Sequence, residues 1–191
     1  MSKVTTAEEL AKFLAAEYPD RGATWAMKVV YYVQGWHIAW EGTPAFHDRL
    51  EAWNLGPVAP AAYTAFDNYQ LRVPRPTWSM PEEITSIARS VADFYHRYSG
   101  TDLISRTHDE APWANAYGTA PSFNSRGTNP IIEESEMRTY FTQHAALAEE
   151  KPSRPATTAR ADRWDIDPDE LDRFTTSSAK RWAEALELLS R

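Results

Sequence analysis

The segment from Thr24 to Trp40 constrains the fold most, because a helix formed by it is apolar on nearly every side. Large apolar residues recur along it at helical spacing, and others fill much of the opposite face. They are Trp25, Val29, Tyr32, Trp36 and Trp40 on the first face and Met27, Val30, Tyr31 and Ile38 on the second. Such a helix is stable only when it is buried all round, so we expect it in the middle of the fold.

Shorter helices are predicted before and after this segment. Thr6-Ala7-Glu8-Glu9 is a capping-box pattern and indicates a helix over residues 6–17. Periodic apolar residues with Pro or Gly at their boundaries predict four more, which run from Pro60 through Phe66, from Pro81-Glu82 to Ser99-Gly100, from Thr101, and through Met137 to about residue 150. The helices account for most of the first 150 residues.

The residues between the helices contain little regular structure. Pro and Gly limit the stretch Phe46–Pro60 to extended, turn-rich backbone with room for one short strand. Leu71–Pro81, which contains three prolines, and Asn124–Pro130 are predicted surface loops. The predicted fold class is therefore mainly α: a compact single helical domain with a short β element around residues 46–58.

A change in composition divides the chain near residue 150. Residues 1–150 form the predicted helical domain, and residues 151–161, with two prolines and no large apolar side chain, form a predicted linker. Residues 162–191 are predicted to be a helical extension, whose last helix carries an apolar stripe of Trp182, Leu186 and Leu189. The stripe either folds back on its own core or docks on a partner, and the sequence leaves both open.

Composition argues against several classes of function. The 191 residues carry a formal charge of −7, and no run of Lys or Arg could neutralise consecutive phosphates, which disfavours nucleic acid as a partner. Cysteine is absent, so no disulfide or thiolate site is expected. The N-terminus has no signal-peptide pattern and no apolar run reaches membrane length, which predicts a cytoplasmic protein. The eight Trp and nine Tyr favour protein interfaces.

No pattern typical of catalysis or cofactor binding is present. The cluster His108-Asp109-Glu110 could supply ligands or acid–base groups and, together with His37 or His47-Asp48, leaves a metal-dependent hydrolase as one hypothesis. However, adjacent residues on a helix point in different directions, and neither HExxH spacing nor a GxSxG elbow occurs. We therefore predict no enzyme activity, no cofactor and no metal.

Two polar residues in apolar surroundings are better explained by structure than by chemistry. His37 lies between Trp36 and Ile38, where we expect a hydrogen bond in the core to satisfy its ring. Glu51 is near Trp53, and its carboxylate must find a donor, for instance Lys28, Arg106 or backbone amides.

Three blocks of sequence occur in a recognisable order. They are MKVVYYVQGWHIA (27–39), FHDRLEAWNLGPVAP (46–60) and THDEAPW (107–113). In this order they resemble the Panacea domain family, also described as SocA-like or GepA-type phage-associated proteins. The resemblance runs from Trp25 to Phe141 and implies a mainly helical antitoxin that neutralises a toxin, encoded by a neighbouring gene, through direct contact. One member type is instead an adaptor that delivers its toxin to a protease, and the family implies no catalytic residues.

The resemblance also implies structural roles for the residues of these blocks. We assign such roles to Lys28, Tyr32, Gln34, Gly35, Trp36, His37, Glu51, Trp53, Gly56, Pro57, His108, Pro112 and Trp113. The chain departs from the family pattern at two points. Asn54-Leu55 replace a basic-aromatic pair, and Arg106 stands where an apolar or small residue is common. Neither departure changes the expected fold.

Toxin binding is expected on surfaces outside these blocks. The residues predicted to contact the toxin are Arg72, Arg75 and Trp78 in the loop and Trp164, Phe174 and Trp182 in the extension. An acidic chain favours a basic partner, such as a toxin that acts on RNA or translation. The alternatives are a proteolytic adaptor, a metal-dependent hydrolase and a DNA-binding autoregulator, and the charge argues against the last.

Overall fold

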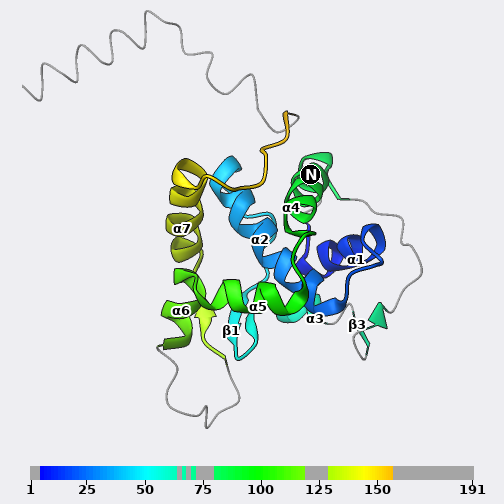
Figure 1. The fold of residues 1–191 in the computed structure, drawn as a ribbon, viewed down its shortest axis with the longest axis horizontal. Coiled ribbons are helices and arrows are strands. Elements are labelled where there is room, and N and C mark those ends of the chain that lie inside the picture. The colour runs from blue at the N-terminus through cyan, green and yellow to red at the C-terminus, as the bar shows by residue number, and fades with distance from the viewer. Residues whose placement is uncertain (1–4, 64–65, 68–69, 72–79, 119–128, 157–191) are drawn as a thin grey trace, which may run out of the picture. The chain divides into compact units, whose positions relative to one another are not determined.

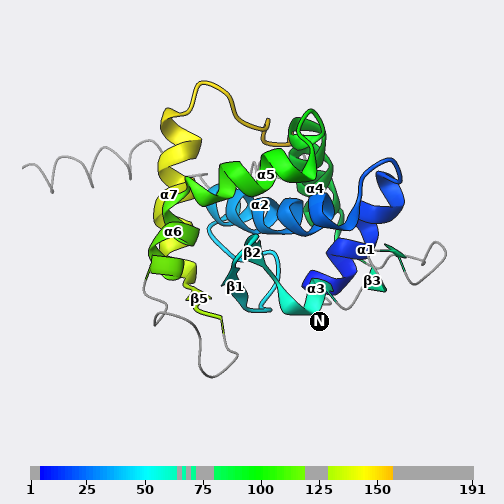
Figure 2. The same ribbon diagram turned by 60° about the horizontal axis from the view of Figure 1, so that its bottom comes forward.

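Helix α2 (Ala23–Glu41) runs through the middle of the protein, as its apolar pattern predicts (Figures 1 and 2). Most of its side chains are buried, including the polar ones of Lys28, Gln34 and His37. The helix ends at Gly42, which has a left-handed conformation with φ of 70°. The computed structural model describes residues 5–63, 66–67, 70–71, 80–118 and 129–156.

Six further helices surround α2 in the described part of the chain. They are α1 (Ala7–Glu17), α3 (Pro60–Tyr63), α4 (Glu82–Tyr95), α5 (Gly100–His108), α6 (Ala111–Gly118) and α7 (Glu134–Leu147). Helices α4 and α7 pack on different sides of α2, and α1 and α5 also contact it (Figure 1). The prediction of a mainly helical domain is confirmed.

Two capping boxes fix the starts of α1 and α5. The Thr6 hydroxyl accepts a hydrogen bond from Glu9 N, and the Glu9 carboxylate accepts one from Thr6 N, as predicted. Ser99 and Asp102 make the same reciprocal pair at α5. Helix α5 therefore begins at Gly100, and α4 ends at Tyr95, several residues before the predicted end of that helix.

The β structure is more extensive than the single short strand expected. Strands β1 (Leu50–Trp53) and β2 (Gly56–Val58) form an antiparallel hairpin, and β5 (Ile131–Ile132) pairs with the other edge of β1. A second pair is formed by β3 (Phe66–Asp67) and β4 (Gln70–Leu71). Phe66 and Leu71 therefore lie in strands, so the predictions of a helix through Phe66 and a loop from Leu71 are wrong at these residues.

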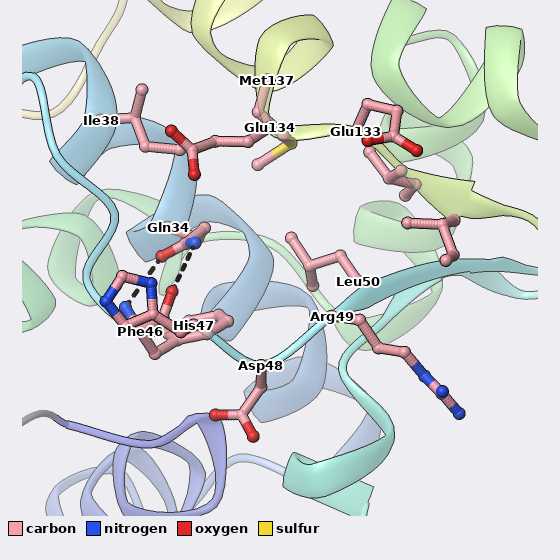
Figure 3. Close-up of a pocket in the computed structure, with 12 residues that line it drawn as sticks. Gln34, Ile38, Phe46, His47, Asp48, Arg49, Leu50, Glu133, Glu134 and Met137 are labelled. Atoms are coloured by element: carbon pink, nitrogen blue, oxygen red, sulfur yellow. Dashed lines mark hydrogen bonds between the residues drawn. The ribbon is translucent and has the colours of Figure 1, made fainter.

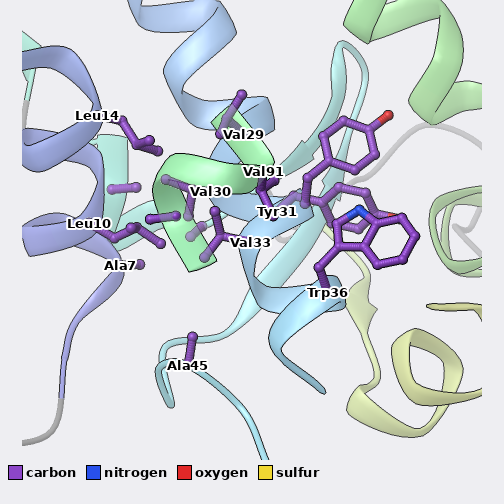
Figure 4. Packing of buried hydrophobic residues seen from close by; sticks show 14 of the residues in the cluster. Ala7, Leu10, Leu14, Val29, Val30, Tyr31, Val33, Trp36, Ala45 and Val91 are labelled. Atoms are coloured by element: carbon purple, nitrogen blue, oxygen red, sulfur yellow. The ribbon is translucent and has the colours of Figure 1, made fainter. Parts of the chain in front are cut away.

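The apolar core fills the space between α1, α2 and α4. Figure 4 shows Leu10 and Leu14 of α1 facing Val30 and Val33 of α2, with Val91 of α4 beside them. These side chains have essentially no exposure to solvent. Burying each of them stabilises the fold by about 1.5–3 kcal/mol relative to leaving it exposed, which is why α2 tolerates its polar residues.

An aromatic cluster joins α2 to α4 and α7 on another side. The rings of Tyr32 and Tyr95 stack with centroids 3.8 Å apart, and Trp36 Nε1 donates to the Tyr95 hydroxyl at 3.3 Å. Phe141 of α7 meets Trp36 edge-on at 5.7 Å. Its ring lies against the backbone of Gly35, where a Cβ atom would be 2.3 Å from Phe141 Cε2. Gly35 is therefore needed for the close approach of α7.

Residues 151–156, the first part of the predicted linker, run along the helical domain. The Arg154 guanidinium donates to the Glu41 carboxylate at 3.0 Å, and Lys151 Nζ donates to the Ala145 carbonyl. Pro152 is buried. The predicted extension at 162–191 lies outside the described residues.

We predict that Gly35→Ala destabilises the protein by about 1 kcal/mol. Alanine favours a helix interior by about 1 kcal/mol, but overpacking a core costs about 1–3 kcal/mol, and the Phe141 ring is only 1% exposed and cannot move aside. Denaturant unfolding measures the change. Gly118→Ala, at the end of α6 where a Cβ meets nothing within 4 Å, is the control and should leave stability unchanged or slightly raised. Adding Phe141→Leu should restore part of the loss, and a Gly35→Ala variant as stable as wild type would contradict the packing argument.

Candidate functional site

The polar residues of the first sequence block hold neighbouring loops against α2. The Gln34 amide donates to the Phe46 carbonyl at 3.0 Å and accepts from the backbone N–H groups of Ala45 and Phe46 at 2.9 and 3.2 Å. His37 Nδ1 lies 2.7 Å from the Thr43 carbonyl, so the predicted internal hydrogen bond is confirmed. Each of these side chains forms hydrogen bonds with loop backbone groups, in place of the bonds that these groups lose to water when they are buried.

Lys28 is the most unusual residue on this helix, because its ammonium group is buried. The side chain is 2% exposed, and Nζ donates to the Pro57 carbonyl at 2.9 Å. Burial lowers the pKa of Lys28 to about 7. Nζ also lies near Gly56, whose φ of 92° and whose closeness to the Thr107 hydroxyl exclude a side chain. Lys28 and Gly56 together fix the hairpin against α2 and α5.

Glu110, which the sequence analysis considers only as part of the His108-Asp109-Glu110 cluster, is a second buried charge. Its two carboxylate oxygens accept hydrogen bonds from the hydroxyls of Tyr31 and Tyr32, both at 2.9 Å. Burial raises the pKa of Glu110 to about 7, although the two phenol hydrogen bonds favour the charged form. A usable signal was present, since Leu103, Thr107 and Glu110 follow helical spacing and all three are buried.

The second and third sequence blocks meet at the β1–β2 hairpin. Trp113 Nε1 donates to the Trp53 carbonyl at 3.0 Å, and the Trp113 ring stacks on His108 with centroids 4.0 Å apart. Glu51 accepts from Trp53 Nε1 at 2.8 Å and pairs with Arg49 at 2.6 Å. The carboxylate thus has the donors it was expected to need, but they are side chains of neighbouring residues in and just before β1 rather than the suggested Lys28, Arg106 or backbone amides.

Apolar side chains are exposed around this hairpin. Leu55 at the turn is 59% exposed and Ile131 on β5 is 52% exposed. Tyr117 of α6 is also exposed, and its hydroxyl donates to Asn54 Oδ1 at 3.3 Å, which places it beside the turn. The half-buried Trp53 and the exposed Leu55, Tyr117 and Ile131, which lie on the hairpin or on the elements beside it, are called the hairpin surface below. Large exposed apolar side chains gathered at one place are typical of a protein-binding surface.

A hollow of about 180 Å³ adjoins the hairpin surface and shares Ile131 with it. Figure 3 shows its lining, with Gln34 on one side and Met137 and Leu50 on others. Carboxylates from Glu133 and Glu134 lie along its edge. The Glu134 carboxylate pairs with Arg138 at 2.7 Å, while that of Glu133 has no partner among the described residues. Asp48 and Arg49 also line the hollow, so its lining carries three carboxylates against one guanidinium and is acidic on balance.

The residues of the hydrolase hypothesis do not form a common site. His108 stacks on Trp113, Asp109 is exposed, and Glu110 is turned inward to the tyrosine pair. His37 is bound to the loop at Thr43. Within the described ranges, no group of three or more His, Asp or Glu side chains is placed to hold a metal ion. The predicted divergence of the three adjacent residues is confirmed.

The structure describes the predicted structural residues but not the predicted toxin contacts. All thirteen residues assigned structural roles lie in α2, the hairpin or the α5–α6 region. Arg72, Arg75, Trp78, Trp164, Phe174 and Trp182 lie outside the described residues. None of the described helices is both long and apolar enough to cross a membrane.

The geometry is that of a mainly helical domain whose characteristic residues build the fold and whose hairpin exposes apolar side chains. Residues 27–114 match the family model described as antitoxin SocA-like, Panacea domain. The match covers slightly less than half of the chain and confirms the family resemblance of the three sequence blocks. No curated protein and no solved structure matches the chain.

We predict that the stability of the protein rises between pH 7 and pH 9 relative to that of Lys28→Met. The folded-state pKa of Lys28 is lowered, so the unfolded chain binds more protons than the folded one above pH 7. The slope contributed by this residue approaches about 1.4 kcal/mol per pH unit. Urea unfolding of both proteins at pH 7, 8 and 9 measures the difference, and a constant difference would contradict the lowered pKa.

Proposed function

We propose that the chain is an antitoxin that neutralises a protein toxin by direct binding in the cytoplasm. The match of residues 27–114 to an antitoxin family model carries this proposal. The arrangement of the family residues supports a binding role, because Lys28, Gln34 and His37 are occupied in holding backbone carbonyls. Residues committed in this way are poorly placed to perform catalysis.

The hairpin surface is the proposed contact with the toxin. Leu55 and Ile131 expose apolar area that the fold itself does not bury, and Trp53 and Tyr117 supply aromatic side chains of the kind that anchor interfaces. The turn Asn54-Leu55 is also where the chain departs from its family pattern. A change at an exposed turn on a shared scaffold is a physical route to a different partner.

Charge supports a basic toxin. The net charge of −7 attracts a basic partner from a distance, and the acidic lining of the hollow beside Ile131 extends this attraction to the hairpin surface. A toxin that binds RNA presents a positively charged face of this kind. An association rate that falls as salt rises is expected from such steering.

The alternatives make different demands on the same chain. A proteolytic adaptor also binds the toxin, but the toxin is then degraded in cells that contain the protease and persists in cells that lack it. The contacts proposed for the extension, Trp164, Phe174 and Trp182, are tested by cutting the chain after Ala156, since residues 151–156 pack along the domain. Loss of neutralisation by this truncated, folded chain assigns part of the interface to the extension.

We predict that co-expression of this chain rescues colony growth that the neighbouring gene alone prevents. The variant Leu55→Ser/Ile131→Thr should bind the toxin at least tenfold more weakly and fail to rescue, because apolar anchors at an interface are worth about 1–2 kcal/mol each or more. Its thermal unfolding should match wild type, since both residues are exposed.

Leu147→Ser is the matched control for this pair. Leu147 is 73% exposed at the end of α7, which is remote from the hairpin (Figure 1). The Leu147→Ser variant should therefore rescue growth as the wild-type chain does. A neighbouring gene that is harmless would remove support for the antitoxin proposal. Rescue by the double variant would leave that proposal standing but move the interface away from the hairpin.

A further inference from the structure

A pocket of about 210 Å³ lies beside the buried carboxylate of Glu110, between α4, α5 and α7. Four aromatic side chains contribute to its lining: Phe94, Tyr95, Tyr140 and Phe141. Glu110, only 8% exposed, also lines it. The pocket thus has aromatic side chains and a buried carboxylate in its wall. It lies on a different part of the domain from the hairpin surface.

The carboxylate of Glu110 is buried without a positive partner. Its two hydrogen bonds come from the neutral hydroxyls of Tyr31 and Tyr32, and each oxygen retains a second lone pair. In the described part of the chain, no Lys or Arg forms an ion pair with it, and the charge of Arg106 acts on it only from beyond that distance, lowering its pKa in part. A buried charge in this state is unfavourable, and a cation beside it would relieve the cost.

The other charged groups at the pocket do not form an ion pair with Glu110, although the charge of Arg106 favours its ionised form. The guanidinium of Arg106 lies 4.5 Å from the ring centroid of Tyr98, and the carboxylate of Glu150 pairs with Arg97 at 2.7 Å. Asp109 adds a negative charge. Burial, followed by the charge of Arg106, lowers the pKa of His144, which keeps this ring neutral at pH 7. The faces of aromatic rings are electron-rich and attract organic cations.

We propose that this pocket binds a guanidinium or alkylammonium group, with Glu110 as its counter-ion and the surrounding rings as its walls. The cation comes either from a free small molecule or from a Lys or Arg side chain of a bound protein. The proposal stands apart from the antitoxin function, because the pocket and its charge are properties of the chain alone.

Proton linkage gives the pocket a distinctive signature. Burial raises the pKa of Glu110 to about 7, so a cation that requires the carboxylate displaces about half a proton at pH 7. The pKa values of the facing phenols of Tyr31, Tyr32, Tyr95 and Tyr140 are raised by burial, so these groups stay neutral. Protonation of His144 at low pH adds a positive charge at the pocket and weakens cation binding. Protonation of Glu110 weakens it as well, so both groups favour tighter binding at higher pH.

Calorimetric titration of the full chain with methylguanidinium tests the proposal, and methylurea is the neutral control. We expect a Kd of about 1 mM at pH 7, about tenfold tighter binding at pH 8 than at pH 6, and no binding of methylurea. Titrations in buffers of different ionisation enthalpy measure the released proton. Glu110→Gln, which keeps the side-chain shape, should abolish binding and its pH dependence.

A second variant keeps the test decisive if Glu110→Gln does not fold. Tyr140→Leu leaves the carboxylate in place, removes an aromatic wall, and should weaken methylguanidinium binding about fivefold. Binding of methylurea equal to that of methylguanidinium, or affinity that neither pH nor these variants change, would overturn the proposal. Absence of methylguanidinium binding to the wild-type chain would do the same.

The toxin complex separates the two sources of the cation. If Glu110→Gln weakens the toxin complex as well as methylguanidinium binding, a basic side chain of the toxin occupies the pocket. If only methylguanidinium binding is lost, the natural ligand is a free amine or guanidine. Both results support cation binding in the pocket. Neither result changes the outcome expected for the growth experiment on the hairpin variants.

Discussion

Burial of α2 on all sides is the constraint on which the rest of the structure depends. A helix surrounded by protein cannot leave its polar side chains to water, so each must find a partner on a neighbouring element. Gln34 and Lys28 do so by binding backbone carbonyls of the chain between α2 and α3, and Tyr31 and Tyr32 do so at Glu110. The apolar faces supply stability, while the polar contacts determine which loops lie where. The hairpin is one consequence of this arrangement.

The same constraint separates fold from function. The residues that carry the family resemblance are mostly inside, where they contact one another, whereas the exposed residues Leu55 and Ile131 lie at the hairpin turn and the sheet edge. Leu55 and Ile131 can change without disturbing α2, whereas Gly35 cannot, because Phe141 occupies the space of a side chain. A scaffold built in this way can retain its core and vary its partner. Glu110 is the exception, since it is buried and still borders a pocket.

Local sequence signals predicted the parts of the fold that local interactions determine. The period of α2 and the capping box at Thr6 gave both helices nearly to the residue. Ser99 and Asp102 carry the same signal, and α5 begins at Gly100, one residue before the predicted start at Thr101. Strand β5 could not be predicted from Ile131-Ile132, because two residues form a strand only through pairing with distant β1. For the same reason the hairpin surface and the tyrosine pair at Glu110 emerge only when three separate segments meet.

Hydrogen–deuterium exchange of the chain alone and in complex with the toxin tests the central claim most directly, because it reports on the rigid core and the binding surface together. The account predicts that α2 is strongly protected in both states and that protection increases on binding at the β1–β2 hairpin, α6 and β5. Increased protection confined to α1 and α4, with the hairpin unchanged, would contradict it, as would rapid exchange of α2 in the free protein.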